Sequence, residues 1–205
     1  MVKRPRGRPR KSEDERDDGN RRHELLTQAA RLFRLKGFDA TSTRDIAAAV
    51  GMHSGSPFYH FKSKDALLYA VMEEGMHSAI ARQARALQGA GPTADPPLVQ
   101  IKRLIRAHFD TLLGPGNDFV PVMLYEHRSL SVAQRASLDK LQVDYETAWT
   151  PVLQALHASG QLRAPVKLSR LLILGALNWS VQWFDRKKGA SLDELTDAAM
   201  ALFLR

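Results

Sequence analysis

The chain has 205 residues, contains no cysteine, and carries 30 Lys or Arg against 22 Asp or Glu, for a formal net charge of +8. The lack of cysteine excludes disulfides, thiolate chemistry and cysteine-bound zinc, and the apolar runs are too short for a membrane-spanning helix. The basic N-terminus lacks the apolar segment of a secretory signal, so we expect a soluble, cytoplasmic protein with no membrane partner.

The positive charge is concentrated in the N-terminal third. Residues 1–64 contain 15 Lys or Arg and 8 Asp or Glu, whereas residues 65–205 contain 15 and 14. A charge of +7 on one part and +1 on the other is typical of a protein whose N-terminal part faces a polyanion. The distribution favours a nucleic acid as partner.

Residues 1–20 form a basic arm with no apolar face, and we expect it to be disordered by itself. Within it, Arg6, Arg8 and Arg10 alternate with glycine and proline in a run that resembles the core of an AT-hook. Such a run can lie extended, so that the arginines reach the narrow minor groove of A·T-rich DNA. The alternative is a solvated tail.

Residues 23–36 have the apolar spacing of a helix that buries one broad face. The apolar positions are Leu25, Leu26, Ala29, Leu32 and Phe33. Gly37 follows where helices commonly end in the left-handed conformation. This helix would complete a small three-helix core.

Residues 42–64 have the pattern of a helix-turn-helix. Ser42 and Asp45 form a capping box for a first helix, and Gly51 follows it as a turn residue. Ser54 is a candidate N-cap for a second helix through about His60. Two short helices joined by a glycine-containing turn are typical of a motif whose second helix enters the DNA major groove.

The segment over residues 30–68, ARLFRLKGFDATSTRDIAAAVGMHSGSPFYHFKSKDALL, is similar to the DNA-binding domain of the TetR family of bacterial transcriptional regulators. The resemblance implies an all-α, two-domain homodimer whose C-terminal domain binds a small molecule and thereby alters DNA affinity. Residues 21–66 would form the three-helix DNA-binding domain, and residues 67–205 the helical bundle for ligand binding and dimerisation.

The resemblance also implies which residues contact double-stranded DNA. Thr43 and Arg44 open the first motif helix, where backbone N–H groups can meet phosphates. Lys64 matches a phosphate-binding lysine at the start of the following long helix. The base-reading positions would be Ser54, Gly55 and Ser56, with His53 in the turn, and further contacts would come from Tyr59, His60 and Lys62.

The rest of the chain also has helical spacing, and no segment has a convincing strand pattern. We expect Ser63 to cap a helix to about residue 88 that Gly75 interrupts, and Ser191 with Glu194 to cap the last helix. Between them helices are predicted over residues 98–113, 119–130, 131–158, with a kink at Pro151, and 168–188. The C-terminal part is therefore expected to be a helical bundle.

The last two helices resemble the pair through which this family dimerises. Leu171, Leu174, Leu177 and Val181 form an apolar stripe on the first of them. Two copies of this pair would form an isologous interface whose two-fold axis matches a palindromic operator. Alternatively, the stripe belongs to the intramolecular core.

An effector pocket needs apolar walls and a few converging polar groups. Asn178 is a candidate because an amide inside the apolar run LLILGALNW needs a partner when buried, whether ligand, water or a neighbouring helix. The full set of candidates is Phe109, Met123, Tyr125, His127, Trp149, Asn178, Trp179 and Trp183.

Two segments, YEHRSL and GALNWSVQWF, are similar to family members that sense acyl-CoA thioesters. The resemblance implies a small hydrophobic effector such as an acyl-CoA, with Arg128 or a nearby lysine facing its anionic nucleotide.

The sequence therefore predicts a repressor that leaves a palindromic operator when an effector binds. The alternative is a constitutive architectural DNA-binding protein without a ligand. The sequence has no nucleophile, base and acid at motif spacing, no phosphate-cradling glycine loop and no HExxH motif, so no enzyme activity, cofactor or metal site is expected.

Overall fold

The computed structural model describes residues 13–52, 57–88 and 95–205. Over these residues every regular element is a helix, and the all-α prediction is confirmed. None of these helices has the length and apolar composition that a membrane crossing requires. The α-helices are α1 (Glu13–Lys36), α2 (Thr43–Ala49), α3 (Pro57–His60), α4 (Lys64–Leu87), α5 (Pro97–Leu113), α6 (Phe119–Glu126), α7 (Val132–Thr147), α8 (Thr150–Ala158), α9 (Val166–Trp179) and α10 (Leu192–Phe203).

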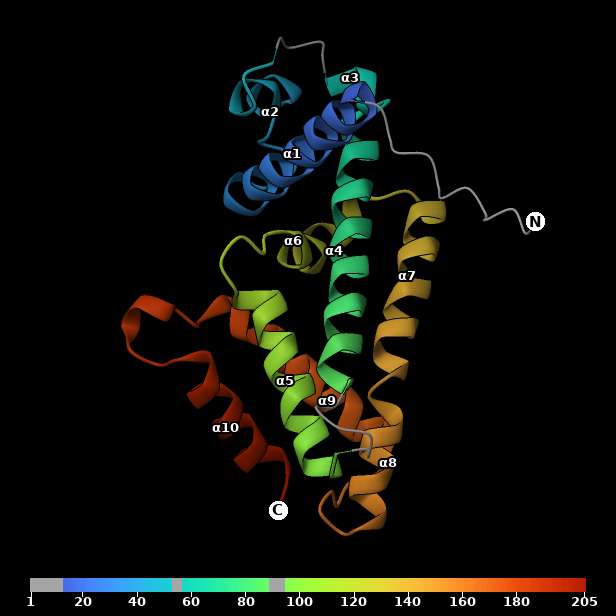
Figure 1. Ribbon diagram of the computed structural model, residues 1–205, viewed down its shortest axis with the longest axis vertical. Coiled ribbons are helices and arrows are strands. Elements are labelled where there is room, and N and C mark those ends of the chain that lie inside the picture. Colours follow the sequence, from blue (N-terminus) through green and yellow to red (C-terminus); the bar gives the residue numbers. More distant parts are fainter. Residues whose placement is uncertain (1–12, 53–56, 89–94) are drawn as a thin grey trace, which may run out of the picture.

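Helix α4 joins the two halves of the molecule. In Figure 1 it runs from the small group formed by α1, α2 and α3 at one end into the bundle of α5, α7 and α8 at the other. Its N-cap, Ser63, accepts a hydrogen bond from the Ala66 N–H, as the sequence predicted. Because one continuous helix belongs to both halves, a displacement of α4 in the bundle also moves the N-terminal group.

The N-terminal group is held by a small apolar core and one well-formed cap. Leu25, Phe33 and Ile46 are fully or almost fully buried in this core. The predicted capping box is present: the Ser42 hydroxyl accepts from the Asp45 N–H, and the Asp45 carboxylate accepts from the Ser42 N–H. The Ser42 hydroxyl also donates to the Asp45 carboxylate at 2.6 Å, and this hydrogen bond, together with the one from the Ser42 N–H, lowers the pKa of Asp45. Helix α2 therefore begins with a charged carboxylate that is hydrogen-bonded.

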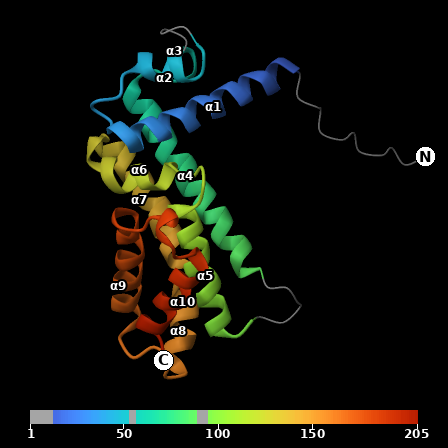
Figure 2. The same cartoon turned by 90° about the vertical axis from the view of Figure 1, so that its left-hand side faces the viewer.

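Helix α1 begins at Glu13, ten residues before the predicted start at residue 23. Residues 13–22 have no apolar stripe, which is why the sequence indicated a disordered segment there. The segment is nevertheless rich in acidic residues, which favour a helix N-terminus, and its C-terminal continuation is anchored in the core by Leu25 and Leu26. In Figure 2, α1 extends past the bundle towards the N-terminal end of the chain.

The C-terminal bundle packs α4, α5, α7 and α8 around a continuous core, with α9 and α10 on the outside (Figure 2). The predicted single helix over residues 131–158 is two helices, because Pro151 lies in the first turn of α8 and starts a new helix. Gly75 does not interrupt α4. It is a contact residue, since a Cβ at this position would lie 2.8 Å from the Cβ of Phe119 in α6.

The last predicted helices are also divided. Helix α9 ends at Trp179 and is followed by two short 3-10 segments, η2 (Ser180–Gln182) and η3 (Arg186–Lys188), so the prediction of one helix over residues 168–188 is wrong. Gly189 has a φ of 118°, which favours glycine. The predicted capping box of Ser191 and Glu194 opens α10.

Candidate DNA-binding surface and effector cavity

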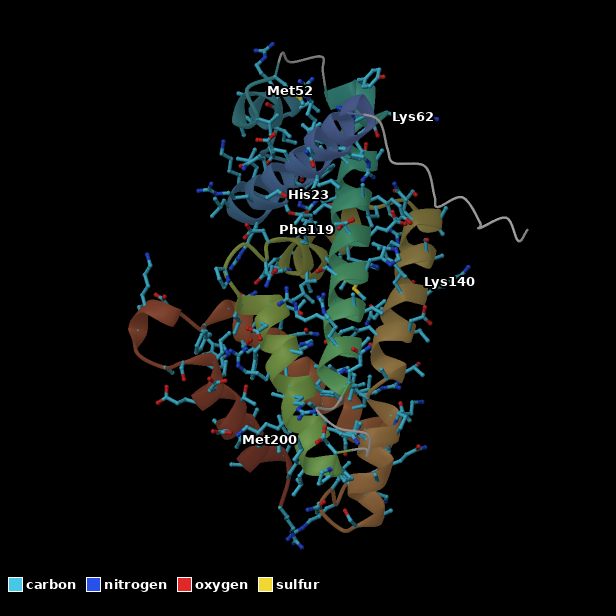
Figure 3. The ribbon with its side chains drawn as sticks, in the orientation of Figure 1. His23, Met52, Lys62, Phe119, Lys140 and Met200 are labelled. Carbon is cyan, nitrogen blue, oxygen red and sulfur yellow. The ribbon has the colours of Figure 1, made fainter. Side chains whose placement is uncertain are left out.

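The end of the molecule that carries α2 and α3 presents several of the predicted DNA contacts. Thr43 and Arg44 occupy the first turn of α2, and the Tyr59 side chain on α3 is 85 % exposed. Figure 3 shows Met52 and Lys62 at this end, whereas Met200 lies far away on α10. The ring of His60 packs edge-on against Tyr59, with centroids 5.3 Å apart.

Seven predicted DNA contacts lie outside the described residues. They are Arg6, Arg8 and Arg10 of the basic arm, His53 of the predicted turn, and Ser54, Gly55 and Ser56 at the predicted start of the second motif helix. Their roles remain predictions from the sequence.

Lys64 has a different environment from the one that the sequence suggested. Its ammonium donates hydrogen bonds to the carbonyl oxygens of Phe38 and Thr41, at 2.9 and 3.0 Å, and lies 4.1 Å from the centre of the Phe38 ring. These contacts join the start of α4 to the loop between α1 and α2. They favour a positioning role for Lys64 within the domain, and a phosphate contact stays a prediction.

Helix α6 is bound to the N-terminal half near both of its ends. Asp118, just before the helix, pairs with Arg34 of α1 at 2.7 Å. At its last residue, the Glu126 carboxylate accepts a hydrogen bond from the Phe38 N–H at 2.9 Å. Since the Phe38 carbonyl in turn accepts from Lys64, α6 is linked through one residue to the start of α4.

The same helix forms a wall of a cavity of about 230 Å³ inside the bundle. The cavity is lined by six apolar side chains, by six polar side chains that include two histidines, and by one carboxylate. The lining residues are Met76 and Ala79 of α4, His108 and Thr111 of α5, Val120, Met123 and Leu124 of α6, His127 of the short 3-10 segment η1 (His127–Ser129) that follows α6, Gln142, Tyr145 and Glu146 of α7, and Leu174 and Asn178 of α9. Apolar walls with a few converging polar groups are characteristic of a small-molecule site.

Three helices meet at His108, which the sequence reading missed. His108 Nδ1 lies 2.7 Å from the Tyr145 hydroxyl, and Nε2 lies 3.1 Å from Oδ1 of Asn178. Because Oδ1 can only accept, we assign the proton to Nε2, which leaves Nδ1 to accept from Tyr145. Burial lowers the pKa of His108 to about 4 and raises the pKa of Tyr145, so all three side chains are neutral near pH 7.

This group is also connected to α4. Gln83, buried on α4, donates from Nε2 to the backbone carbonyl of Tyr145 at 2.9 Å.

The sequence does contain a signal that could have identified His108. It is a polar residue between the apolar residues Leu104 and Phe109 of a buried stripe. This is the same argument that singled out Asn178.

Only part of the predicted ligand set lines the cavity. Met123, His127 and Asn178 do, and His127 Nε2 also lies 3.3 Å from the Asp139 carboxylate. Phe109 and Trp149 are buried in the surrounding core instead. Tyr125 is half exposed and accepts a hydrogen bond from Gln182.

The other two predicted ligand residues, Trp179 and Trp183, are 64 % and 58 % exposed and do not line the cavity. Trp179 belongs instead to an exposed apolar face of α9, which we call the α9 ridge: Leu168, Leu171, Leu172, Gly175 and Trp179. Only part of the predicted interface stripe is exposed: Leu171 lies on the α9 ridge, whereas Leu174 and Leu177 are buried in the core.

Comparisons with known proteins agree with this architecture. The family model of the tetracyclin repressor-like C-terminal domain matches residues 94–205, that of the tetR family of bacterial regulatory proteins matches residues 25–71, and an AT hook motif matches residues 3–15. The HTH-type transcriptional repressor KstR2 of Mycolicibacterium smegmatis is 26% identical over 190 residues, which cover 90% of this chain and 89% of that protein.

Two solved structures have the same fold. The superantigen PfiT is 39% identical with a TM-score of 0.73, over 90% of this chain and 96% of the other. AibR in complex with isovaleryl coenzyme A and operator DNA is 23% identical with a TM-score of 0.80, over 89% of this chain and 97% of the other, and this likeness shows the fold alone. The chain belongs to the TetR family of bacterial transcriptional regulators and is a ligand-responsive, DNA-binding repressor.

Proposed function

We propose that an apolar small molecule enters the cavity, displaces α6, and thereby releases a homodimer of this chain from a palindromic operator. The observation that carries the proposal is the double role of α6. Its residues Val120, Met123 and Leu124 face the cavity, and the carboxylates near its ends hold Arg34 and the Phe38 N–H. A ligand that moves α6 must break or shift these contacts, and it thus changes the placement of the DNA-binding helices.

The proposed effector is an acyl-CoA thioester. Support comes from the AibR structure, which contains isovaleryl coenzyme A and has the same fold, and from the KstR2-like relationship along the whole chain. Arg128 is exposed and follows directly after His127, which lines the cavity. A cation at this position suits the anionic nucleotide part, while the cavity takes the apolar acyl part.

The proposed dimer forms through α9 and α10. The α9 ridge exposes large apolar side chains along one face of a helix, and Leu202 of α10 is 80 % exposed. A Cβ at Gly175, in the middle of the ridge, would meet no atom within 4 Å. A contiguous apolar face of this kind favours burial against a second copy.

On DNA, we propose that α2 and α3 contact the major groove and its phosphates while Arg6, Arg8 and Arg10 enter an adjacent A·T-rich minor groove. The AT hook match to residues 3–15 supports the second contact.

The proposed function is tested by selecting bound sequences from random DNA and then adding acyl-CoAs of different chain length to the complex. We expect a palindromic site and its release by at least one acyl-CoA. Binding that follows A·T content alone, with no palindrome and no release, would instead support a constitutive architectural protein.

The role of α6 has its own test. In Glu126→Ala the Phe38 N–H loses its acceptor, so the effector concentration needed for half-release should rise at least about tenfold, which corresponds to a coupling loss of about 1.4 kcal/mol. Asp144→Ala, an exposed acidic residue on α7, serves as the matched control. Equal release by both variants would contradict coupling through Glu126.

A further inference from the structure

The polar groups of the cavity indicate which chemical form of an effector it accepts. Asn178 presents an amide whose oxygen already accepts from His108 Nε2. The amide nitrogen of Asn178 therefore turns away from the histidine, and it has no acceptor among the residues that the structure describes. Because the residue lines the cavity, this NH2 group is a hydrogen-bond donor available to a ligand oxygen.

The orientation of this donor is fixed by its neighbours. With the histidine proton assigned to Nε2, the Tyr145 hydroxyl donates to His108 Nδ1 and the Nε2 proton holds Oδ1 of Asn178. The histidine is neutral because burial lowers its pKa to about 4. It therefore orients Asn178 but provides no positive charge to the cavity.

The charged residues of the cavity wall also favour a neutral ligand group. Among the described lining residues there is no Lys or Arg, and Glu146 contributes a carboxylate. Lys140 of the same helix points away from the bundle (Figure 3). Arg170 approaches Glu146 at 3.6 Å from outside the lining set and donates to Thr150. The Glu146 carboxylate also accepts from Gln142 at 2.8 Å, and His127, the other titratable group beside the cavity, lies 3.3 Å from Asp139. The nearby cationic groups thus already face acidic partners, so a ligand carboxylate in the cavity would meet the Glu146 anion without a cation of its own, which is unfavourable in a partly desolvated site.

We propose that the cavity selects the neutral carbonyl group of an ester or thioester, with the Asn178 amide as its hydrogen-bond donor, and that Glu146 excludes the corresponding free carboxylate. This inference rests on the proposed effector role of the cavity and names the class of molecule that the cavity takes. A repressor built in this way responds to the activated acyl group and ignores the unactivated acid.

The test uses matched pairs of ligands that differ only in this group. The probes are the N-acetylcysteamine thioesters of isovaleric, octanoic and cyclohexanecarboxylic acid, and the sodium salts of the same three acids. Binding to the full chain is measured by calorimetry and thermal shift, without DNA. For the pair that binds best, we expect the thioester to bind at least about 30-fold more tightly than the acid, since like charges at a recognition site cost several kcal/mol.

Two variants assign the selectivity to its residues. Asn178→Asp keeps an acceptor for His108 and removes the donor, so thioester affinity should fall at least about tenfold. Glu146→Gln removes the anion and leaves the Arg170 cation without its acidic partner, so affinity for the free acid should rise at least about tenfold. Asp144→Asn, an exposed residue two positions earlier on α7, should change neither affinity. Circular dichroism and thermal unfolding check that each variant is folded.

The possible results distinguish a failure of the selectivity for thioester over acid from a failure of the proposed acyl effector. Equal affinity for acid and thioester, or a Glu146→Gln variant that still rejects the acid, would overturn the selectivity while a ligand-responsive repressor remained. Failure of all six probes to bind would overturn the inference. If the acyl-CoAs also failed to release the operator, the proposed acyl effector would be overturned with it.

Discussion

The ammonium of Lys64 lies above the ring of Phe38, 4.1 Å from its centre, and donates to the Phe38 carbonyl at 2.9 Å. The first residue of α4 is thus attached to the loop that follows α1. The Phe38 N–H is at the same time bound by Glu126. One loop residue therefore connects the DNA-binding helices to both α4 and α6.

We predict that Lys64→Met destabilises the fold by about 1–3 kcal/mol, because two carbonyl oxygens lose a charged donor. Operator affinity should fall by a similar factor for all operator sequences, with an unchanged salt dependence. Lys62→Met is the matched variant: Lys62 is exposed, so its loss should leave stability intact and reduce the salt slope by about 1 per subunit. Chemical denaturation and binding titrations at several salt concentrations measure both effects. A reduced salt slope in Lys64→Met would restore a direct phosphate contact.

Removal of residues 1–11 should weaken binding to all DNA sequences and reduce the salt dependence, because the deletion takes away up to six cations per subunit. The loss should be largest for operators with A·T-rich flanks, whose minor groove is narrow. Fluorescence anisotropy over a range of salt concentrations gives the slope. An identical slope for the shortened chain would show that the arm does not contact phosphates.

His108 predicts a pH dependence of stability. Its pKa is about 4 in the folded protein against 6.5 for the ordinary side chain, so between these values the unfolded state binds a proton that the folded state does not. The stability from this residue is therefore complete above about pH 6.5 and decreases by about 3 kcal/mol as the pH falls to 4. In His108→Gln this part of the decrease should disappear. Urea unfolding at fixed protein concentration between pH 7 and pH 4 measures the difference, and parallel pH profiles would rule out a buried neutral histidine.

The α9 ridge predicts the dimer interface. Leu172 is 65 % exposed at the centre of the ridge, so a lysine there should produce monomers at about 10 μM and reduce operator affinity at least about tenfold, since the two half-sites would no longer be bound together. Val143→Lys changes an equally exposed apolar residue on α7 and should remain dimeric. Analytical ultracentrifugation distinguishes the two. A dimeric Leu172→Lys would place the interface elsewhere.

The helix starts of this fold could be predicted because their signals are local. The boxes of Ser42 with Asp45 and of Ser191 with Glu194 contain donor and acceptor within four residues. Such caps form regardless of what the helix later packs against. The predicted N-cap at Ser63 is also present, and Ser131 caps α7 in the same way.

The positions of Pro151, Gly75 and the tryptophans depended on tertiary contacts. A proline can kink a helix or begin one, and Pro151 begins α8. Glycine can interrupt a helix or admit a neighbour, and Gly75 admits Phe119. Trp179 was predicted to line the pocket, but its orientation follows from the burial of Leu174 and Leu177 on the opposite face of α9. The sequence alone could not show which face of α9 the bundle would cover.

Helix α4 has a consequence for redesign of this protein as a biosensor. It contributes Met76 and Ala79 to the cavity and begins at Lys64 in the DNA-binding half. A change of effector specificity made on α4 will therefore also alter the basal expression level of a reporter gene. The cavity side of α7, which carries Gln142, lies on a helix outside the DNA-binding half. Libraries directed at Gln142, whose amide is hydrogen-bonded within α7 to Glu146, should therefore change which molecule is detected with a smaller effect on the reporter signal in the absence of effector.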